Sequence, residues 1–240
     1  MIENHKAEQI SAEMCQRAYE QNCRQSQDVD LSTLTTEQLK WQFVEKAREV
    51  CPQWQVRADQ REVINDIFRW CLRLDGNLDP NKGLWLYGNI GTGKSTMLRI
   101  IRAFCRGVRT YYSEKYKLQM PYTFRIANAI DVCSSFSKSG YAGIDEFING
   151  QCQAFDELGS ESIPTGYYGT AENVFQYIFQ RRYDVFQKID LITHVSTNIS
   201  PKDPYTGQNQ IIDRYGERIW DRCREMFNFV PYMGATWRKK

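Results

Sequence analysis

The fold of this chain is decided by the stretch Gly83-Leu84-Trp85-Leu86-Tyr87-Gly88-Asn89-Ile90-Gly91-Thr92-Gly93-Lys94-Ser95-Thr96. It reads as an apolar strand, a glycine-rich turn and the start of an apolar helix. Its segment 88–95 fits the pattern G-x-x-x-x-G-K-[ST] of a phosphate-binding loop without a mismatch. Glycines let such a loop aim backbone N–H groups at a polyphosphate, which also meets the positive end of the following helix. We therefore expect a nucleotide site at this turn.

Each residue of the loop has an expected role. Phosphate contacts are expected from the consecutive residues Gly88, Asn89, Ile90, Gly91, Thr92, Gly93, Lys94, Ser95 and Thr96. The Lys94 ammonium is expected to reach the β- and γ-phosphates, and the Ser95 hydroxyl to bind the Mg²⁺ that bridges them. The predicted ligands are therefore ATP and Mg²⁺.

A pair of carboxylates follows downstream. Segment 152–161 is short and mostly apolar until it reaches Asp156 and Glu157, so it reads as a strand that delivers two acids. Ligands of open α/β sheets bind at the carboxyl ends of the strands, which places both acids beside the phosphate loop. We expect Asp156 to hold the hydrated Mg²⁺ and Glu157 to orient and activate the attacking water.

A third strand, predicted at 191–198, ends in a polar cluster. Asn198 at its end is placed to hydrogen-bond the catalytic water or the γ-phosphate. His194 lies inside the strand, and we expect it to be a packed side chain rather than a base.

Hydrophobic periodicity predicts the remaining elements. Helices are expected over 36–50, 59–74, 130–148, 171–183 and 211–227, and strands over 122–127 and 227–230. Together these elements predict an α/β fold with a five-stranded parallel sheet flanked by helices. We divide the chain into an N-terminal helical partner-binding segment, 1–55, and an ATPase domain, 56–240.

Composition limits the possible function classes. The chain has 240 residues, 42% of them hydrophobic, which is typical of a folded globule. The net charge of +2 does not indicate a nucleic-acid binder, so any basic surface has to be local. None of the eight cysteines forms a C-x-x-C pair, and no apolar run is long enough to span a membrane. With no hydrophobic signal core at the N-terminus, we expect a cytoplasmic protein.

One local basic stretch is a candidate contact for single-stranded DNA. Segment 105–120 interleaves cations with aromatic rings: Arg106, Arg109, Tyr111, Tyr112, Lys115, Tyr116 and Lys117. Cations follow a nucleic-acid backbone and rings stack on bases. An ordinary solvated helix or loop explains the same stretch equally well.

The order of these motifs resembles that of the AAA+ helicase loaders of the DnaC/DnaI type and the related IstB transposition ATPases. Two later stretches carry the resemblance: Gly216-Glu217-Arg218-Ile219-Trp220-Asp221-Arg222 is similar to the loader segment that contains the arginine finger, and Gly234-Ala235-Thr236-Trp237-Arg238 to the G-x-S-x-R-type ending. The resemblance covers about residues 57–238. No substantial helical lid is expected after the last strand.

The resemblance assigns roles to individual residues. It implies that Lys94 and Ser95 belong to Walker A, Asp156 and Glu157 to Walker B, and that Asn198 is sensor 1. Arg222 is the first choice for the arginine finger inserted into a neighbouring subunit, and Arg218 is its rival.

The resulting hypothesis is a Mg²⁺-dependent AAA+ ATPase that acts as a helicase loader. It would self-assemble through its ATP sites, bind single-stranded DNA and contact a hexameric replicative helicase through residues 1–55. One alternative is an IstB-like ATPase that regulates a transposase on duplex DNA. A second is a P-loop small-molecule kinase, and a third is a nucleotide-gated binding module with little hydrolysis.

Overall fold

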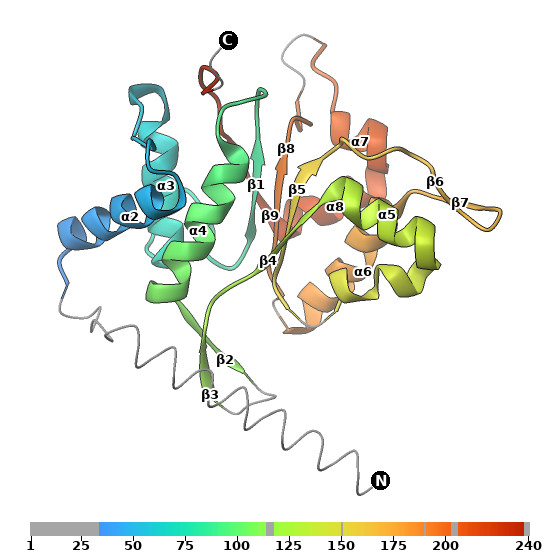
Figure 1. The fold of residues 1–240 in the computed structure, drawn as a ribbon, viewed down its shortest axis with the longest axis horizontal. Coiled ribbons are helices and arrows are strands. Elements are labelled where there is room, and N and C mark those ends of the chain that lie inside the picture. The colour runs from blue at the N-terminus through green and yellow to red at the C-terminus, as the bar shows by residue number, and fades with distance from the viewer. Residues whose placement is uncertain (1–33, 114–117, 150, 190, 203–205, 238–240) are drawn as a thin grey trace, which may run out of the picture.

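The structure is a computed structural model that describes residues 34–113, 118–149, 151–189, 191–202 and 206–237. Its centre is a five-stranded sheet in the order β4-β5-β8-β1-β9 (Figure 1). The strands are β1 (Gly83–Tyr87), β4 (Arg125–Asn128), β5 (Gln153–Leu158), β8 (Thr193–Thr197) and β9 (Phe227–Pro231). Every neighbouring pair is parallel. The predicted α/β fold with a five-stranded parallel sheet is therefore confirmed.

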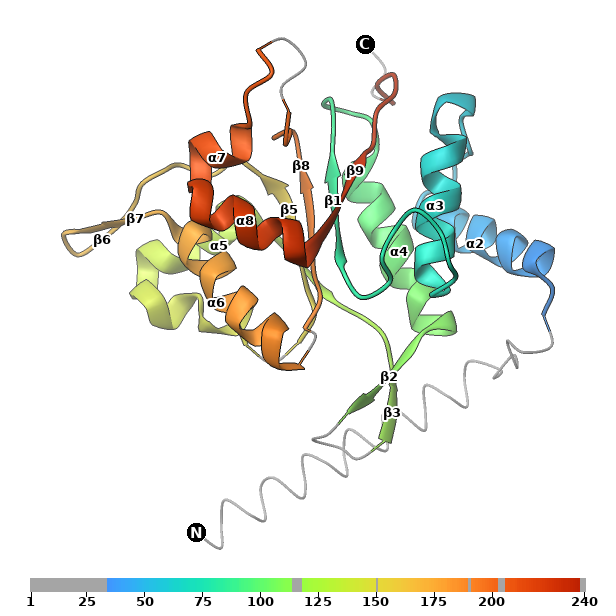
Figure 2. The ribbon, with the colours of Figure 1, turned by 180° about the vertical axis from the view of Figure 1, so that it is seen from behind.

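Helices cover both faces of the sheet, as Figures 1 and 2 show. One face carries α2 (Thr36–Val50), α3 (Arg61–Cys71) and α4 (Lys94–Val108); the other carries α5 (Ala129–Ser139), α6 (Val174–Ile189), α7 (Gln210–Tyr215) and α8 (Glu217–Met226). Side chains of β1 alternate between the two layers: Leu84 and Leu86 belong to the first hydrophobic cluster and Trp85 to the second. The strand that enters the phosphate loop is therefore held from both sides.

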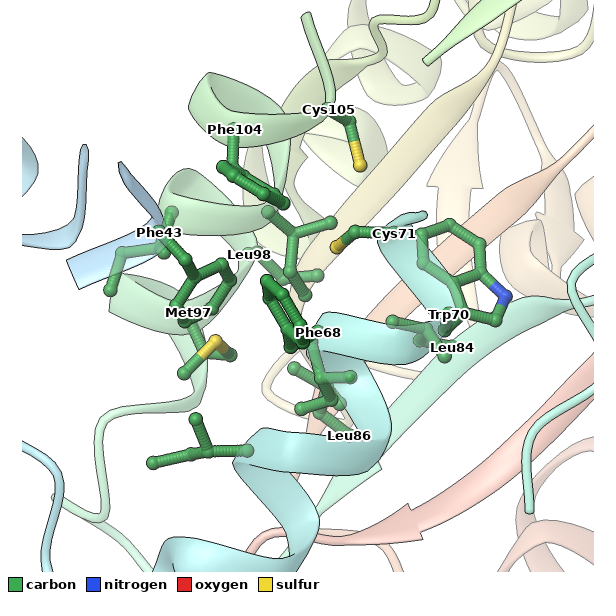
Figure 3. Packing of buried hydrophobic residues seen from close by; sticks show 14 of the residues in the cluster. Phe43, Phe68, Trp70, Cys71, Leu84, Leu86, Met97, Leu98, Phe104 and Cys105 are labelled. Atoms are coloured by element: carbon green, nitrogen blue, oxygen red, sulfur yellow. The ribbon is translucent and has the colours of Figure 1, made fainter. Parts of the chain in front are cut away.

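The three helices of the first layer contact one another through three phenylalanines, one from each helix. Phe43 of α2 meets Phe68 of α3 and Phe104 of α4 edge to face, with ring centroids 5.8 and 5.0 Å apart (Figure 3). Helix α2 begins at a capping box in which the Thr35 side chain accepts from the backbone of Gln38. The predicted N-terminal segment 1–55 thus includes a helix of the main core, and its residues 1–33 lie outside the described part of the chain.

Two hairpins occur where the sequence predicted no strands. Strands β2 (Thr110–Ser113) and β3 (Leu118–Pro121) pair antiparallel, and β4 begins at Arg125 rather than at the predicted Tyr122. Strands β6 (Thr165–Tyr167) and β7 (Thr170–Glu172) form a second hairpin in a predicted loop. Both hairpins extend away from the central sheet (Figure 1).

The helix predicted over 211–227 is interrupted. Gly216 adopts φ +86°, ends α7 and lies at the start of α8. A positive φ is readily available to glycine alone, so the chain turns at this residue. No helix follows β9 as far as Trp237, where the described chain ends.

Candidate nucleotide-binding site

The phosphate loop, residues 88–93, connects β1 to the N-terminus of α4. Gly93 lies at the N-cap of α4 with φ +96°, a left-handed conformation that strains any other L-residue. The α4 residues Met97 and Leu98 are fully buried, which anchors the helix on the sheet. The loop therefore has the local geometry of a site for a polyphosphate at a helix N-terminus.

Lys94 is held at the centre of the loop. Its Nζ donates to the carbonyls of Gly88 and Asn89 at 2.8 and 2.7 Å and to Asn198 Oδ1 at 2.8 Å. Burial lowers the pKa of Lys94 to about 8, against the opposing effect of Asp156 and Glu157. A bound anion would favour the charged form of Lys94 and offset the cost of its desolvation, so this ammonium is placed to bind a phosphate.

Ser95 and Asp156 face each other beside the lysine. Ser95 Oγ donates to Asp156 Oδ1 at 2.7 Å, and Ser196 Oγ from β8 donates to the same oxygen. A hydroxyl and a carboxylate are oxygen ligands of the kind that Mg²⁺ prefers. Among the described residues no cluster of three or more His, Cys, Asp and Glu could hold a metal alone. The pair fits a Mg²⁺ that takes its remaining ligands from phosphates and water.

Glu157 is turned out of the regular strand alternation. Its φ is +58°, and the pairing of β5 with β8 shifts register between Phe155 and Leu158. The Glu157 carboxylate accepts a hydrogen bond from Asn128 Nδ2 at 2.9 Å, and its N–H donates to Ser196 Oγ at 3.2 Å. The strand thus presents Asp156 to Ser95 and Glu157 to the open side of the site.

Asn128 and Ser196 are site residues that the sequence reasoning missed. Asn128 is the last residue of β4 and caps α5, because its Oδ1 accepts from the Ile130 N–H at 2.9 Å. An Asn at the end of a strand, directly before a helix, was the available signal for a polar residue at this edge of the sheet. Ser196 had a signal as well, since it lies in the polar end of the 191–198 strand.

A cavity of about 530 Å³ opens over these side chains. Eight of the predicted functional residues line it: Ile90, Gly91, Gly93, Lys94, Ser95, Thr96, Glu157 and Asn198. The remaining lining residues are Cys51, Gln53, Trp54, Ile130, Ser160, Ser196, Thr197, Tyr232 and Trp237. The volume lies within the range of small-molecule sites in proteins. The phosphate loop, Glu157 and the end of β8 therefore converge on a single cavity, and Asp156 lies behind Ser95, which lines it.

The two candidate arginine fingers lie on α8 and do not line this cavity. Arg222 donates to Gln180 Oε1, and its guanidinium lies 5.0 Å from the centre of the Tyr183 ring, so it is engaged with α6. Arg218 is exposed, and its side chain has no hydrogen bond or ion pair among the described residues. The geometry therefore favours Arg218, the rival in the sequence analysis, as the arginine available to another molecule.

The basic stretch 105–120 contains a residue that cannot reach DNA. Arg109 is 4% exposed, and its guanidinium lies against the rings of both Trp70 and Tyr122, 4.4 Å from each centroid. Its Nη2 donates to the Pro80 carbonyl at 2.8 Å. Arg109 is thus structural, and Lys115, Tyr116 and Lys117 lie outside the described residues. Arg109 therefore cannot take part in the DNA contact predicted for this stretch.

His194 is packed as expected. It is fully buried in β8, where its Nδ1 accepts from the Leu84 N–H at 3.1 Å and its Nε2 lies 2.8 Å from Tyr122 Oη. Burial lowers the pKa of His194 to about 3, so the imidazole is neutral at physiological pH. It lies inside the sheet, away from the lining of the cavity.

Comparison with known proteins supports the fold. No protein-family model matches the chain, and no curated protein matches it significantly. The crystal structure of the DnaC helicase loader matches with a TM-score of 0.52 and 18% identity, over 76% of this chain and 94% of that one. The crystal structure of DnaI matches with a TM-score of 0.50 and 20% identity, over 80% and 93%. The chain therefore has the α/β fold of these two structures. Separately, none of the described helices has the length and apolar character needed to cross a bilayer.

Proposed function

We propose that this chain is an ATP-dependent helicase loader that binds a hexameric replicative helicase and single-stranded DNA and hydrolyses ATP during loading. The observation that carries the proposal is the convergence of Lys94, Ser95, Glu157 and Asn198 on one cavity, in a fold like that of DnaC and DnaI. The fold alone would leave the chemistry open, because a fold can host many functions. The identity and placement of these side chains supply the argument for ATP.

In the proposed reaction, water attacks the γ-phosphorus of ATP, the bond from that phosphorus to the bridging oxygen breaks, and ADP and inorganic phosphate are released. Lys94 binds the phosphates, Glu157 accepts the proton of the attacking water, and Asn198 orients the water or the γ-phosphate. Ser95 and Asp156 would hold Mg²⁺, which when bound would neutralise part of the charge on the phosphates. The hydrogen bond from Asn128 fixes the Glu157 carboxylate on the open side of the site.

Assembly through the ATP sites is part of the proposal, and the exposure of Arg218 on α8 supports it. A guanidinium from a neighbouring subunit would stabilise the charge that develops on the γ-phosphate and make hydrolysis depend on assembly. Arg218 is our choice for this arginine, because it is exposed on α8 while Arg222 is bound to α6. A kinase acting on a small acceptor would have no need of an arginine in trans.

The contact with the helicase is proposed for the N-terminal segment. Helix α2 is packed in the main core through Phe43, so a deletion that keeps this described core has to end before α2. We therefore refine the partner-binding segment to the residues before α2.

The proposal is tested by co-elution of the purified chain with its host's hexameric helicase in the presence of an ATP analogue. We expect a complex with the full chain and none after deletion of residues 1–33, with ATP hydrolysis retained. If the chain forms no complex with the helicase but assembles on duplex DNA when nucleotide is present, the IstB-like regulator would be favoured instead. Phosphate transfer from ATP to an added acceptor, without dependence on assembly, would favour the kinase.

A further inference from the structure

The chain returns to the phosphate loop after its last strand. We call residues Tyr232–Trp237 the C-terminal strap. At its start the Tyr232 N–H donates to the Tyr87 carbonyl at 2.7 Å, and at its end the Trp237 N–H donates to the Gly91 carbonyl at 2.8 Å. Figures 1 and 2 show this end of the chain beside the turn between β1 and α4. The strap is thus bonded to the chain just before the loop and to the loop itself.

The strap approaches the loop more closely than side chains would permit. A Cβ atom on Gly91 would lie 2.1 Å from Thr236 Oγ1, and one on Gly88 would lie 2.6 Å from the Tyr232 carbonyl oxygen. Real Cβ atoms do not approach other atoms this closely. Two glycines of the phosphate loop therefore make room for the strap, in addition to giving the loop its backbone shape.

Two side chains that precede β1 hold the strap in place. Arg57 Nη1 donates to the Ala235 carbonyl at 2.6 Å, and the guanidinium lies 5.2 Å from the centre of the Trp237 ring. Gln60 is 1% exposed, and its Nε2 donates to the Met233 carbonyl at 2.9 Å and to the Thr92 carbonyl at 3.2 Å. The buried Gln60 amide thus joins strap and loop directly. Trp237 lines the cavity, whereas Arg57 does not.

We propose that the C-terminal strap is a positioning element of the nucleotide site, fastened to the phosphate loop by Arg57 and Gln60. The inference rests on the proposed function in that the ligand is a nucleotide. Because strap and loop share hydrogen bonds, loosening the strap leaves the loop less well organised for phosphate. By linkage, a bound nucleotide must in turn strengthen the docking of the strap.

The test uses Arg57→Ala in the full chain, because Arg57 holds the strap without lining the cavity. We expect the Kd of a non-hydrolysable ATP analogue to rise about 5- to 50-fold, the usual size of coupling between two sites. Arg61→Ala is the matched control: Arg61 is exposed at the start of α3 and its side chain has no hydrogen bond or ion pair among the described residues, so the substitution should leave the Kd unchanged. Arg57→Lys keeps the charge and should restore part of the affinity.

A double-mutant cycle with Trp237→Ala tests the path of the effect. If Arg57 acts through the strap, Arg57→Ala should add little to the loss already caused by Trp237→Ala. Additive losses, or an Arg57→Ala variant with the affinity of the wild type, would overturn the proposal. If Arg57→Ala does not fold, Arg57→Lys takes its place, and its Kd should lie above that of Arg61→Ala, because Arg57 does not line the cavity.

Amide hydrogen exchange separates this inference from the proposed function. In the nucleotide-free protein, Arg57→Ala should speed exchange in segment 88–93, whereas Arg61→Ala should not. A wild-type chain that binds no ATP analogue would refute the proposed function. Faster loop exchange in Arg57→Ala would even then support the inference that the strap stabilises the phosphate loop. Unchanged loop exchange in Arg57→Ala would refute the inference that the strap stabilises the loop.

Discussion

Asn128 Nδ2 donates a hydrogen bond to Glu157 Oε2 at 2.9 Å, which joins the end of the edge strand β4 to its neighbour β5. Both residues lie at the carboxyl edge of the sheet, where Asn128 is in register with Asp156. The contact fixes the carboxylate that we propose as general base, because Glu157 has an unusual backbone conformation and is otherwise open to solvent. Asn128 therefore acts on the proposed chemistry through Glu157.

Replacement of Asn128 should impair turnover more than binding. Asn128→Ser keeps a side chain that can cap α5 but removes the amide donor, so the Glu157 carboxylate loses its fixed position. We expect kcat for ATP hydrolysis to fall about 10- to 100-fold, which is typical of a displaced catalytic group, and the Kd for ATP to stay unchanged. Steady-state kinetics with binding measurements would check this. Equal turnover in wild type and Asn128→Ser would show that the contact is dispensable.

Glu157→Gln should bind ATP and fail to hydrolyse it. The amide is nearly isosteric but cannot accept a proton, so we expect kcat to fall about 10²- to 10⁴-fold. Phosphate release measured alongside Kd distinguishes loss of chemistry from loss of binding. Normal turnover in this variant would place the general base elsewhere.

Binding of ATP should weaken as the solution becomes alkaline. Burial lowers the pKa of Lys94 to about 8 in the free protein, and the phosphates bind the ammonium form. As the pH rises through 8, the free protein loses this proton while the bound form keeps it, so Kd should rise about tenfold per pH unit. Titrations between pH 7 and 9.5 measure the effect. Lys94→Ala should abolish binding, and a constant Kd across this range in the wild type would contradict the role of the ammonium.

Local patterns predicted most of the fold and the centre of the site. The strand before the phosphate loop, Lys94 and Ser95 follow one another in sequence, so their spacing alone defines the geometry. The carboxylate pair could be placed because parallel strands end at a common edge. His194 could be assigned to the core because it lies in a run of β-branched residues.

Features that depend on distant parts of the chain could not be predicted. Arg109 is buried because Trp70, from a helix before the phosphate loop, and Tyr122 enclose its guanidinium. The contact between Asn128 and Glu157 depends on the pairing of β4 with β5, which no local pattern specifies. The two extra hairpins have strands of only three or four residues, too short for alternation to stand out.

Helix α2 should contribute to the stability of the whole domain. Phe43 is 3% exposed and contacts aromatic rings from α3 and α4, so Phe43→Ala should lower the free energy of unfolding by about 3–5 kcal/mol. Trp41, on the same helix, is 65% exposed, and Trp41→Ala should change it by less than about 0.5 kcal/mol. Urea unfolding would measure both. A small effect of Phe43→Ala would show that α2 is separable from the core.

The two arginines of α8 should separate into structural and functional roles. Arg222→Ala removes the hydrogen bond to Gln180 and the contact with Tyr183, so it should lower stability with little effect on hydrolysis per assembled site. Arg218→Ala should unfold like the wild type but lose at least about tenfold in assembly-stimulated hydrolysis. Thermal unfolding and ATPase assays at increasing protein concentration would distinguish the two variants.

Mixing two inactive variants tests whether Arg218 acts on another subunit. Lys94→Ala has no functional phosphate loop but keeps Arg218, whereas Arg218→Ala keeps the loop and lacks the arginine. If the arginine is supplied in trans, sites that combine the loop of one variant with the Arg218 of the other regain hydrolysis. Arg222→Ala in place of Arg218→Ala is the control; we expect this variant to hydrolyse ATP before mixing and to gain nothing from the mixture. Recovery with Arg222→Ala alone would return the role to Arg222, and no recovery with either would argue against a shared site.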